Sequence, residues 1–278
     1  MRLRSRFISG AAGLVLAAGA VTLWAGPTFA NVGNQGPGGG SGQTLYVSNS
    51  AGTAFPGPGP WSGAGAGQAG WSGGSPSACA SASYTTISSA VSAASAGDTI
   101  VVCPGFYTEG VVVPAGKPLT IKGIGNPTIN ALNQDNGVQV LASWTTVEGL
   151  RVAYATGEGI LVGGLPGAAG TVSHVTIRDN TVFDNDRGNP TGATITNSSY
   201  AECNASMGVP GDCGEGIHLL SADDSTVTGN ISTGNSGGIL LTDENGPTDG
   251  DVIQSNDVTN NTYDCGITVA GHHVGTTT

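Results

Sequence analysis

Apolar and polar residues alternate in short segments that recur along the chain. Each segment places a β-branched apolar residue between polar or small neighbours, and Ile121, Val147, Ile177, Val227 and Ile253 share this central position. A period of two predicts strands with one buried face. The five aligned segments are 119–124 (LTIKGI), 145–150 (TTVEGL), 175–180 (VTIRDN), 225–230 (STVTGN) and 251–256 (DVIQSN).

A second marker follows each segment and sets the length of the repeat. It reads GEGI at 157–160 and 214–217, SGGI at 236–239 and DCGI at 264–267, and the step from Ile217 to Ile239 is 22 residues. Longer steps contain an insertion at 186–213 or the stretch ENGPTDGD. A leucine-rich repeat of this length needs a regular leucine frame and a return helix, and neither is present. The pattern favours coils of three short strands, stacked in parallel about 4.8 Å apart.

Two columns of asparagine border a four-residue strand in successive coils. Asparagine suits sharp corners because it tolerates the left-handed conformation. Stacked amides can also hydrogen-bond to one another in ladders. We therefore interpret the asparagines as a building rule and not as a binding site: Asn180, Asn230 and Asn256 in one column, and Asn185, Asn235 and Asn261 in the other.

One helix is predicted near the N-terminal end of the repeats, at about 84–95. Ile87, Ala90, Val91 and Ala94 recur at helical spacing, and Gly97-Asp98 ends the pattern. A short helix with one apolar face suits a cap over the open end of a solenoid.

The N-terminus has the features of a secretory signal peptide at 1–30. Three arginines precede an apolar run, and small residues end it at Ala30. An uncleaved anchor is the alternative. Residues 31–43 are typical of a flexible linker, and the β-helix domain is expected over 44–278. The sequence stops midway through a coil, so we expect either that the native C-terminal end is longer or that the open end meets a partner.

The net charge of the chain limits the classes of partner that it can bind. Removing the signal leaves five cations against 19 acids, a net charge of −14. Nucleic acid is excluded as a partner because no basic stripe is present to neutralise phosphates. No later segment is apolar enough to span a bilayer, so the prediction is a secreted, extracellular protein.

Five cysteines in an exported chain indicate disulfides. Cys203 and Cys213 flank the insertion, and Cys79 and Cys103 flank the predicted helix. Both pairs are candidate disulfides, and Cys265 then has no evident partner.

These motifs together resemble a known family. The run YTTISSAVSAASAGDTIVVCPGFYTEG, then PLTIKGIG, then NTVFDN, NISTGN and NDVTNN with GGI or EGI, is similar to right-handed parallel β-helix proteins of the pectate-lyase-like superfamily, especially those with NosD-type repeats. The resemblance covers about 44–278. It implies an all-β, single-stranded right-handed parallel β-helix with a short N-terminal cap helix, and it implies little about chemistry.

Polysaccharide lyases of this fold use an Arg or Lys base, often with Ca²⁺ held by aspartates, and the resemblance makes Arg151 and Arg178 candidates. The alternative for Arg178 is structural. Lys122, Glu148 and Arg178 occupy one outward column, so they are expected to form a surface ladder of alternating charge.

Acidic turns after the third strand are the other candidate site. Counting from each Ile places Asp223, Asp243, Glu244 and His272 along one edge as candidate catalytic residues. Candidate substrate-binding residues are Glu215 and His218, beside the insertion, and Asp224 and His273, in the acidic turns. Carboxylates with histidine can also bind a divalent metal, Ca²⁺ included. The alternative is a solvated turn, because Asp and Asn favour turns.

Three functions remain open at this stage. The first is binding or cleavage of a polysaccharide or cell-surface glycan, by a lyase or glycoside hydrolase if the chain is an enzyme. The second is a non-catalytic structural or adhesive solenoid. The third is metal handling of the copper-processing kind, which rests on fold analogy and lacks a Met/His-rich tract.

Overall fold

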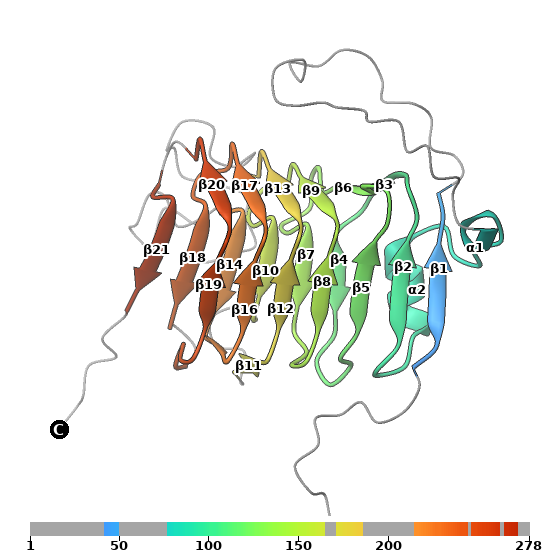
Figure 1. Cartoon of the computed structure of the whole chain (residues 1–278), viewed down its shortest axis with the longest axis horizontal. Coiled ribbons are helices and arrows are strands. Elements are labelled where there is room, and N and C mark those ends of the chain that lie inside the picture. The colour runs from blue at the N-terminus through green and yellow to red at the C-terminus, as the bar shows by residue number, and fades with distance from the viewer. Residues whose placement is uncertain are drawn as a thin grey trace, which may run out of the picture. The chain divides into compact units, whose positions relative to one another are not determined.

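A computed structural model describes residues 42–49, 77–164, 171–185, 214–243, 246–261 and 264–271. These residues wind into stacked coils whose main strands form three parallel sheets, which can be followed by the strand labels in Figure 1. The expected signal peptide (1–30), most of the expected linker and the insertion 186–213 lie outside the described residues.

Each sheet takes one strand from each coil. In hydrogen-bonded order, the first sheet contains β1 (Thr44–Val47), β2 (Thr99–Val102), β5 (Thr120–Gly123), β8 (Thr146–Glu148), β12 (Thr176–Arg178), β16 (Thr226–Thr228) and β19 (Val252–Gln254). The second contains β3 (Phe106–Thr108), β6 (Thr128–Asn130), β9 (Arg151–Ala153), β13 (Thr181–Phe183), β17 (Ile231–Thr233) and β20 (Asp257–Thr259). The third contains β4 (Val111–Val113), β7 (Val138–Val140), β10 (Ile160–Val162), β14 (Ile217–Leu220), β18 (Ile239–Thr242) and β21 (Ile267–Ala270). A short pair, β11 (Val172–Ser173) and β15 (Ala222–Asp223), lies between the third and first sheets in chain order.

The register of the first sheet confirms the aligned segments. Ile121 pairs with Val147, Val147 with Ile177, and Ile177 with Val227. All four side chains are at most 1% exposed and belong to one core. The right-handed parallel β-helix predicted from the sequence is therefore confirmed.

Two asparagine ladders hold the coils in this register. The Asn230 side-chain oxygen accepts hydrogen bonds from the backbone and side-chain nitrogens of Asn180, each at 3.0 Å. Asn235 receives the same pair of bonds from Asn185. These amides also donate to backbone carbonyls, so the side chains replace hydrogen bonds that the corner of the coil leaves unmade.

The left-handed corner lies one residue earlier than expected. The ladder asparagines do not have positive φ; the residues before them do, as at Asp179 (56°), Gly229 (68°), Asp184 (54°) and Gly234 (69°). The prediction that the ladder asparagines adopt this conformation was wrong, since their amides are committed to the neighbouring coil. The Asp179 and Asp184 Oδ1 atoms lie only 2.6 Å from where a Cβ on Gly229 and Gly234 would stand.

Two helices precede the repeats. Helix α1 spans Ser77–Ala80 and α2 spans Ile87–Ala93. Thr86 caps α2, and the Glu109 carboxylate accepts hydrogen bonds from the backbone nitrogens of Ile87 and Ser88. A carboxylate at a helix N-terminus stabilises the exposed N–H groups, while Ile87, Ala90 and Val91 are buried on the other side.

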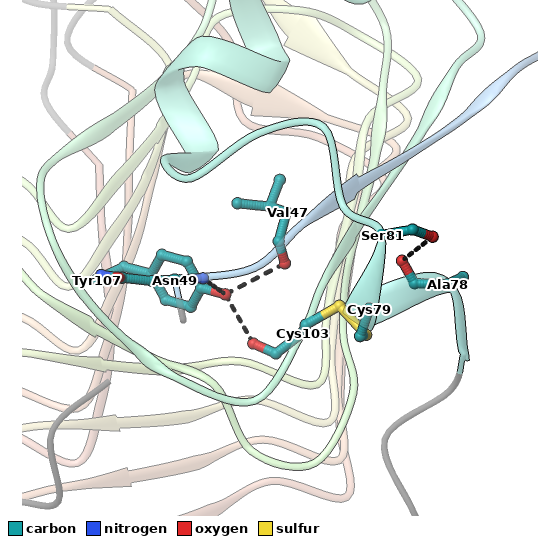
Figure 2. The surroundings of a disulfide bond; sticks show 7 residues. All are labelled: Val47, Asn49, Ala78, Cys79, Ser81, Cys103 and Tyr107. Atoms are coloured by element: carbon teal, nitrogen blue, oxygen red, sulfur yellow. Dashed lines mark hydrogen bonds between the residues drawn. A yellow bond between two sulfur atoms is a disulfide. The ribbon is translucent and has the colours of Figure 1, made fainter. Parts of the chain in front are cut away.

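A disulfide joins Cys79 in α1 to Cys103 after β2 (Figure 2). The buried Tyr107 hydroxyl donates to the Cys103 carbonyl at 2.8 Å, so the bridge is anchored to the first coil. The other candidate pair, Cys203 and Cys213, lies outside the described residues. Cys265 is free and exposed.

Substituting Asn230 by alanine tests the ladder. The change leaves the Asn180 backbone nitrogen and the Ile177 carbonyl without their partner, so we expect a loss of about 2–3 kcal/mol in unfolding free energy. Urea denaturation measures it. Asn130→Ala is the control, because Asn130 is half-exposed and its side chain bonds only locally. Equal losses in the two variants would contradict a special role for the ladder.

Removing the disulfide tests the N-terminal anchor. A bridge that closes a 24-residue separation contributes about 3 kcal/mol. The Cys79→Ala/Cys103→Ala variant should lose that much in denaturant unfolding, while Cys265→Ser should match the parent. An unchanged midpoint in the double variant would show that the bridge does not constrain the unfolded chain.

Candidate functional site

The two GEGI motifs stack directly on each other. Ile160 in β10 pairs with Ile217 in β14, so Glu158 and Glu215 occupy the same column on adjacent coils. The Gly159 nitrogen bonds to the Glu215 carbonyl at 2.9 Å, and Asn136 on the preceding coil accepts from the Glu158 nitrogen. The repeat thus forces two carboxylates together.

His218 of β14 completes the cluster. Its Nδ1 lies 3.5 Å from Glu158 Oε1, and its Nε2 lies 2.8 Å from the Thr242 hydroxyl on the next coil. Glu158, Glu215 and His218 are 2%, 0% and 2% exposed. Each offers one ligand atom, and these atoms lie within 4.8 Å of one another.

Glu215 is the poorly satisfied member of the cluster among the described residues. Burial, and then the neighbouring Glu158 carboxylate, raise the pKa of Glu215 well above its ordinary value, and His218 lowers it in part. Both Glu215 oxygens are buried without a hydrogen-bond donor in the described part of the chain. The two carboxyl groups can satisfy each other only by sharing a proton, or by sharing a cation.

These residues suit a metal ion better than a polymer. Carboxylates and imidazole are ligands for divalent first-row metals. The Thr242 contact holds His218 Nε2 and leaves Nδ1 turned to the glutamates, as an outer hydrogen bond does for a metal-bound histidine. The structure buries Glu215 and His218, so a polysaccharide cannot touch these two predicted substrate-binding residues in this conformation.

The sequence reasoning found Glu215 and His218 but left out Glu158. It read the repeated GEGI as a structural register. The shared register of the two GEGI motifs could have predicted this pair. Identical acids in one column of a parallel β-helix must lie about one strand spacing apart.

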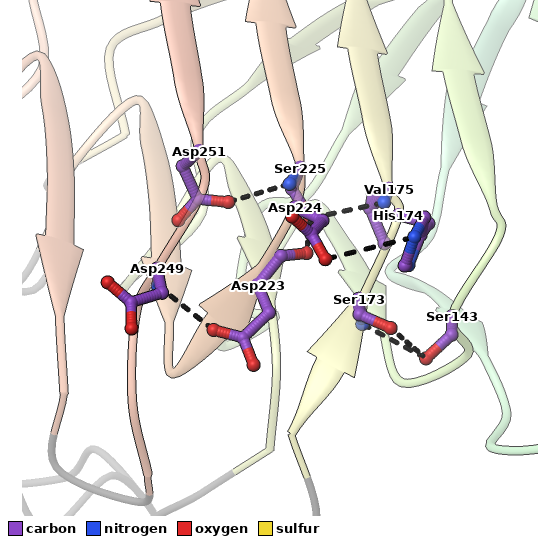
Figure 3. A network of polar contacts seen from close by, with 9 residues as sticks. All are labelled: Ser143, Ser173, His174, Val175, Asp223, Asp224, Ser225, Asp249 and Asp251. Carbon is purple, nitrogen blue, oxygen red and sulfur yellow. Dashed lines mark hydrogen bonds and ion pairs between the residues drawn. The ribbon is translucent and has the colours of Figure 1, made fainter.

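The acidic turns form a separate cluster at the surface (Figure 3). The Asp223 carboxylate accepts from the Asp249 nitrogen at 2.9 Å, and Asp251 accepts from the Ser225 nitrogen at 2.7 Å. Burial raises the pKa of Asp251 to about 6, and the acids Asp223, Asp224 and Asp249 add to the shift.

The predicted register holds at the start of these turns, since Leu220 pairs with Thr242 and this brings Asp243 beside Ser221. Later residues of the longer turn, Asp249 and Asp251, lie against Asp223–Ser225. Within that turn the Thr248 hydroxyl donates to the Thr242 carbonyl. The other three candidates, Glu244, His272 and His273, lie outside the described residues.

An aromatic pair borders this surface. Trp144 is 46% exposed and stacks on His174 with ring centroids 3.9 Å apart, and the His174 Nε2 lies 3.8 Å from an Asp224 oxygen. Figure 3 shows His174 beside Asp224 on neighbouring coils. An exposed ring next to carboxylates is a surface on which a sugar ring can stack.

The two arginine candidates, Arg151 and Arg178, have different contacts. Arg178 and Lys122 both pair with Glu148, which confirms the expected charge ladder and occupies the Arg178 guanidinium. Arg151 instead lies over the Phe183 ring at 4.8 Å, and burial lowers the pKa of its guanidinium. Neither residue faces the buried cluster's ligand atoms in the described contacts.

Comparison with known proteins identifies the family. The family model described as "Periplasmic copper-binding protein (NosD)" matches residues 91–276, which include all three residues of the buried cluster. No curated protein matches the chain. No helix in the described ranges is long and apolar enough to cross a membrane.

One solved structure, described as "Crystal structure of pectate lyase Pel9A", is also similar. The two share 15% sequence identity with a TM-score of 0.43, over 78% of this chain and 55% of the lyase chain. This chain therefore spans about half the length of that lyase. The family model covers well over half of this chain, which confirms the resemblance to NosD-type repeats: the chain belongs to the NosD family.

Proposed function

We propose that this protein binds a divalent transition-metal ion through Glu158, Glu215 and His218. The observation that supports it is the burial of two carboxylates and an imidazole within 4.8 Å of one another, with no donor for Glu215 in the described part of the chain. A cation would remove the repulsion between the carboxylates and would replace the donors that Glu215 lacks among the described residues.

Copper is the first ion to test. The family is described as copper-binding, imidazole is a good copper ligand, and Cu²⁺ binds most nitrogen and oxygen sites more tightly than other divalent first-row ions. Glu158, Glu215 and His218 Nδ1 would hold the ion, and Thr242 would orient the imidazole from the far side. When bound, the ion would supply positive charge between the two carboxylates.

The family description also places these proteins in the periplasm. We propose export for this chain, which agrees with the signal peptide expected at 1–30 and with the Cys79–Cys103 disulfide. The proposed export and the proposed copper ligands therefore agree with the same family description.

Glycan binding is a second candidate, favoured by one separate observation. Trp144 exposes an aromatic face beside His174 and the acidic turns, and such a surface suits a sugar ring. The carboxylates of Asp223, Asp249 and Asp251 are oxygen ligands of the kind that Ca²⁺ prefers. This candidate concerns the surface turns and is independent of the buried cluster.

Replacing Glu215 by glutamine separates a metal site from a structural one. The amide should lower Cu²⁺ affinity by roughly 100-fold, because one charged ligand is lost, yet it can donate a hydrogen bond to Glu158. A buried acid with a raised pKa makes the metal-free protein lose stability as pH rises above the ordinary carboxyl pKa. Glu215→Gln should therefore weaken binding and raise metal-free stability at neutral pH.

Calorimetry with Cu²⁺ and denaturant unfolding with and without the ion measure both effects. The parent should gain about 2.7 kcal/mol at an ion concentration about 100 times Kd. Asp257→Asn is the matched control, because it removes one exposed carboxylate elsewhere. Thr242→Val should cost about tenfold in affinity through the imidazole. Equal affinity in the parent and Glu215→Gln would sink the proposal.

A screen of acidic and neutral glycans, with and without Ca²⁺, tests the second candidate. Trp144→Asn should abolish retention of any bound glycan, and asparagine tolerates the left-handed backbone at this position (φ 64°). Leu132→Ala, which trims another exposed apolar side chain, should leave retention unchanged. Retention that survives Trp144→Asn would rule out this surface.

A further inference from the structure

Arg151 differs from the other Lys and Arg residues of the described ranges, because its guanidinium has no hydrogen-bond acceptor and no acidic partner there. Lys122 and Arg178 both pair with Glu148, and Lys117 donates to backbone carbonyls in the last turn of α2. The whole chain has 19 acids against eight Lys and Arg residues. An arginine that none of the described acids neutralises is therefore unusual in this protein.

The Arg151 side chain is held in place without a counterion. Its guanidinium carbon lies 4.8 Å from the centroid of the Phe183 ring, a cation–π contact that orients the group and leaves its charge in place. Arg151 is half-buried, and this burial lowers the pKa of the guanidinium. A partly desolvated charge attracts an anion more strongly than a solvated one. The planar fork of donors suits the paired oxygens of a carboxylate, sulfate or phosphate.

Tyr154 stands beside this pair in a backbone conformation that bulky residues rarely adopt, with φ 68°. Its equivalents on the next three coils are residues that tolerate the left-handed region: Asp184, Gly234 and Asn260. The Tyr154 ring meets the Phe183 ring edge-on, with centroids 6.1 Å apart. The fold does not require an aromatic residue at this corner, since three other coils turn it without one. The strained tyrosine therefore indicates a use for its ring.

The acid on the neighbouring coil is turned to another coil. Strands β9, β13 and β17 follow one another in the second sheet, and Asp184 comes directly after β13 (Figure 1). Its Oδ1 lies 2.6 Å from where a Cβ on Gly234, after β17, would stand. The Asp184 carboxylate therefore lies on the side of its coil that faces away from Arg151 in β9.

We propose that Arg151, Tyr154 and Phe183 form a binding site for an oxyanion carried on a ring, such as the carboxylate of a sugar acid. Arg151 holds the anion through its fork, and the half-buried Tyr154 contacts the ring. Phe183, only 6% exposed, orients the guanidinium. The role is binding, with no chemical step. The site is independent of the buried metal cluster and of Trp144, which precedes β8 at a different corner.

Titration calorimetry with glucuronate, benzoate and inorganic sulfate tests the site, with glucose as the neutral probe. The protein is first passed over a chelating resin, so that no metal ion contributes. Glucuronate and benzoate should both bind more tightly than sulfate, because they add a ring, and glucose should not bind. Their affinity should fall as salt is added, since Arg151 stays partly exposed to solvent. Sulfate that binds as tightly as both ring-bearing anions would overturn the part assigned to Tyr154.

Arg151→Gln should weaken binding of glucuronate and benzoate roughly tenfold or more, because a charged bidentate contact is lost. Arg151→Lys keeps the charge without the fork and should recover only part of the affinity. Arg178→Gln is the matched control, since it removes a guanidinium that Glu148 already engages, and it should bind as the parent does. Equal losses in Arg151→Gln and Arg178→Gln would show attraction by net charge alone and would overturn the site.

Tyr154→Asn separates a ligand contact from a structural role. Asparagine tolerates the left-handed backbone, so relief of strain should offset the lost contact with Phe183 and keep the unfolding midpoint near that of the parent. Binding of the two ring-bearing anions should nevertheless fall to the level of sulfate. A lower midpoint with unchanged binding would make Tyr154 structural. A parent that binds none of the three anions overturns the site, and Cu²⁺ binding by the buried cluster is untouched by that result.

Discussion

The register between successive coils is the constraint on which the rest of this structure depends. Parallel pairing places equivalent residues of neighbouring coils about 4.8 Å apart, and the Asn180–Asn230 and Asn185–Asn235 bonds hold that alignment at two corners of the coils they join. Identical residues on neighbouring coils lie side by side, so a residue type that can hydrogen-bond to another of its kind stabilises the stack. Asparagine, which is both donor and acceptor, is such a residue; glutamate is not.

The buried cluster follows from the same constraint. Glu158 and Glu215 are brought together by pairing that also stacks Ile160 on Ile217, so the carboxylates cannot separate without breaking the core. Their repulsion is then a fixed property of the fold. A proton or a metal ion relieves it, and the neighbouring imidazole makes the metal ion chemically reasonable. The same fold leaves Asp249 exposed and Asp223 and Asp251 half-buried, so these acids are nearer to solvent than the buried cluster.

Periodicity was enough to predict the core strands, because Ile121, Val147, Ile177 and Val227 differ little in chemistry and recur in matching surroundings. It was enough, too, for the asparagine columns and for the Lys122–Glu148–Arg178 ladder. It did not predict the neighbours of Asp223, because the extra residues of the stretch ENGPTDGD bring Asp249 and Asp251 against Asp223–Ser225. The burial of Glu215 and His218 could not be predicted either. The exposure of a side chain depends on what covers its strand, and the strand's own pattern of apolar and polar residues does not show this.

The corners before the ladders restrict the order in which coils can follow one another. Where one coil has Asp179 or Asp184, the next has Gly229 or Gly234, and the aspartate oxygen occupies the space that a side chain on that glycine would need. An aspartate in place of either glycine would force the aspartate side chain on the preceding coil to turn away from its corner. The residues at these two corners are therefore matched between neighbouring coils, and an exchange of coils would disturb that match.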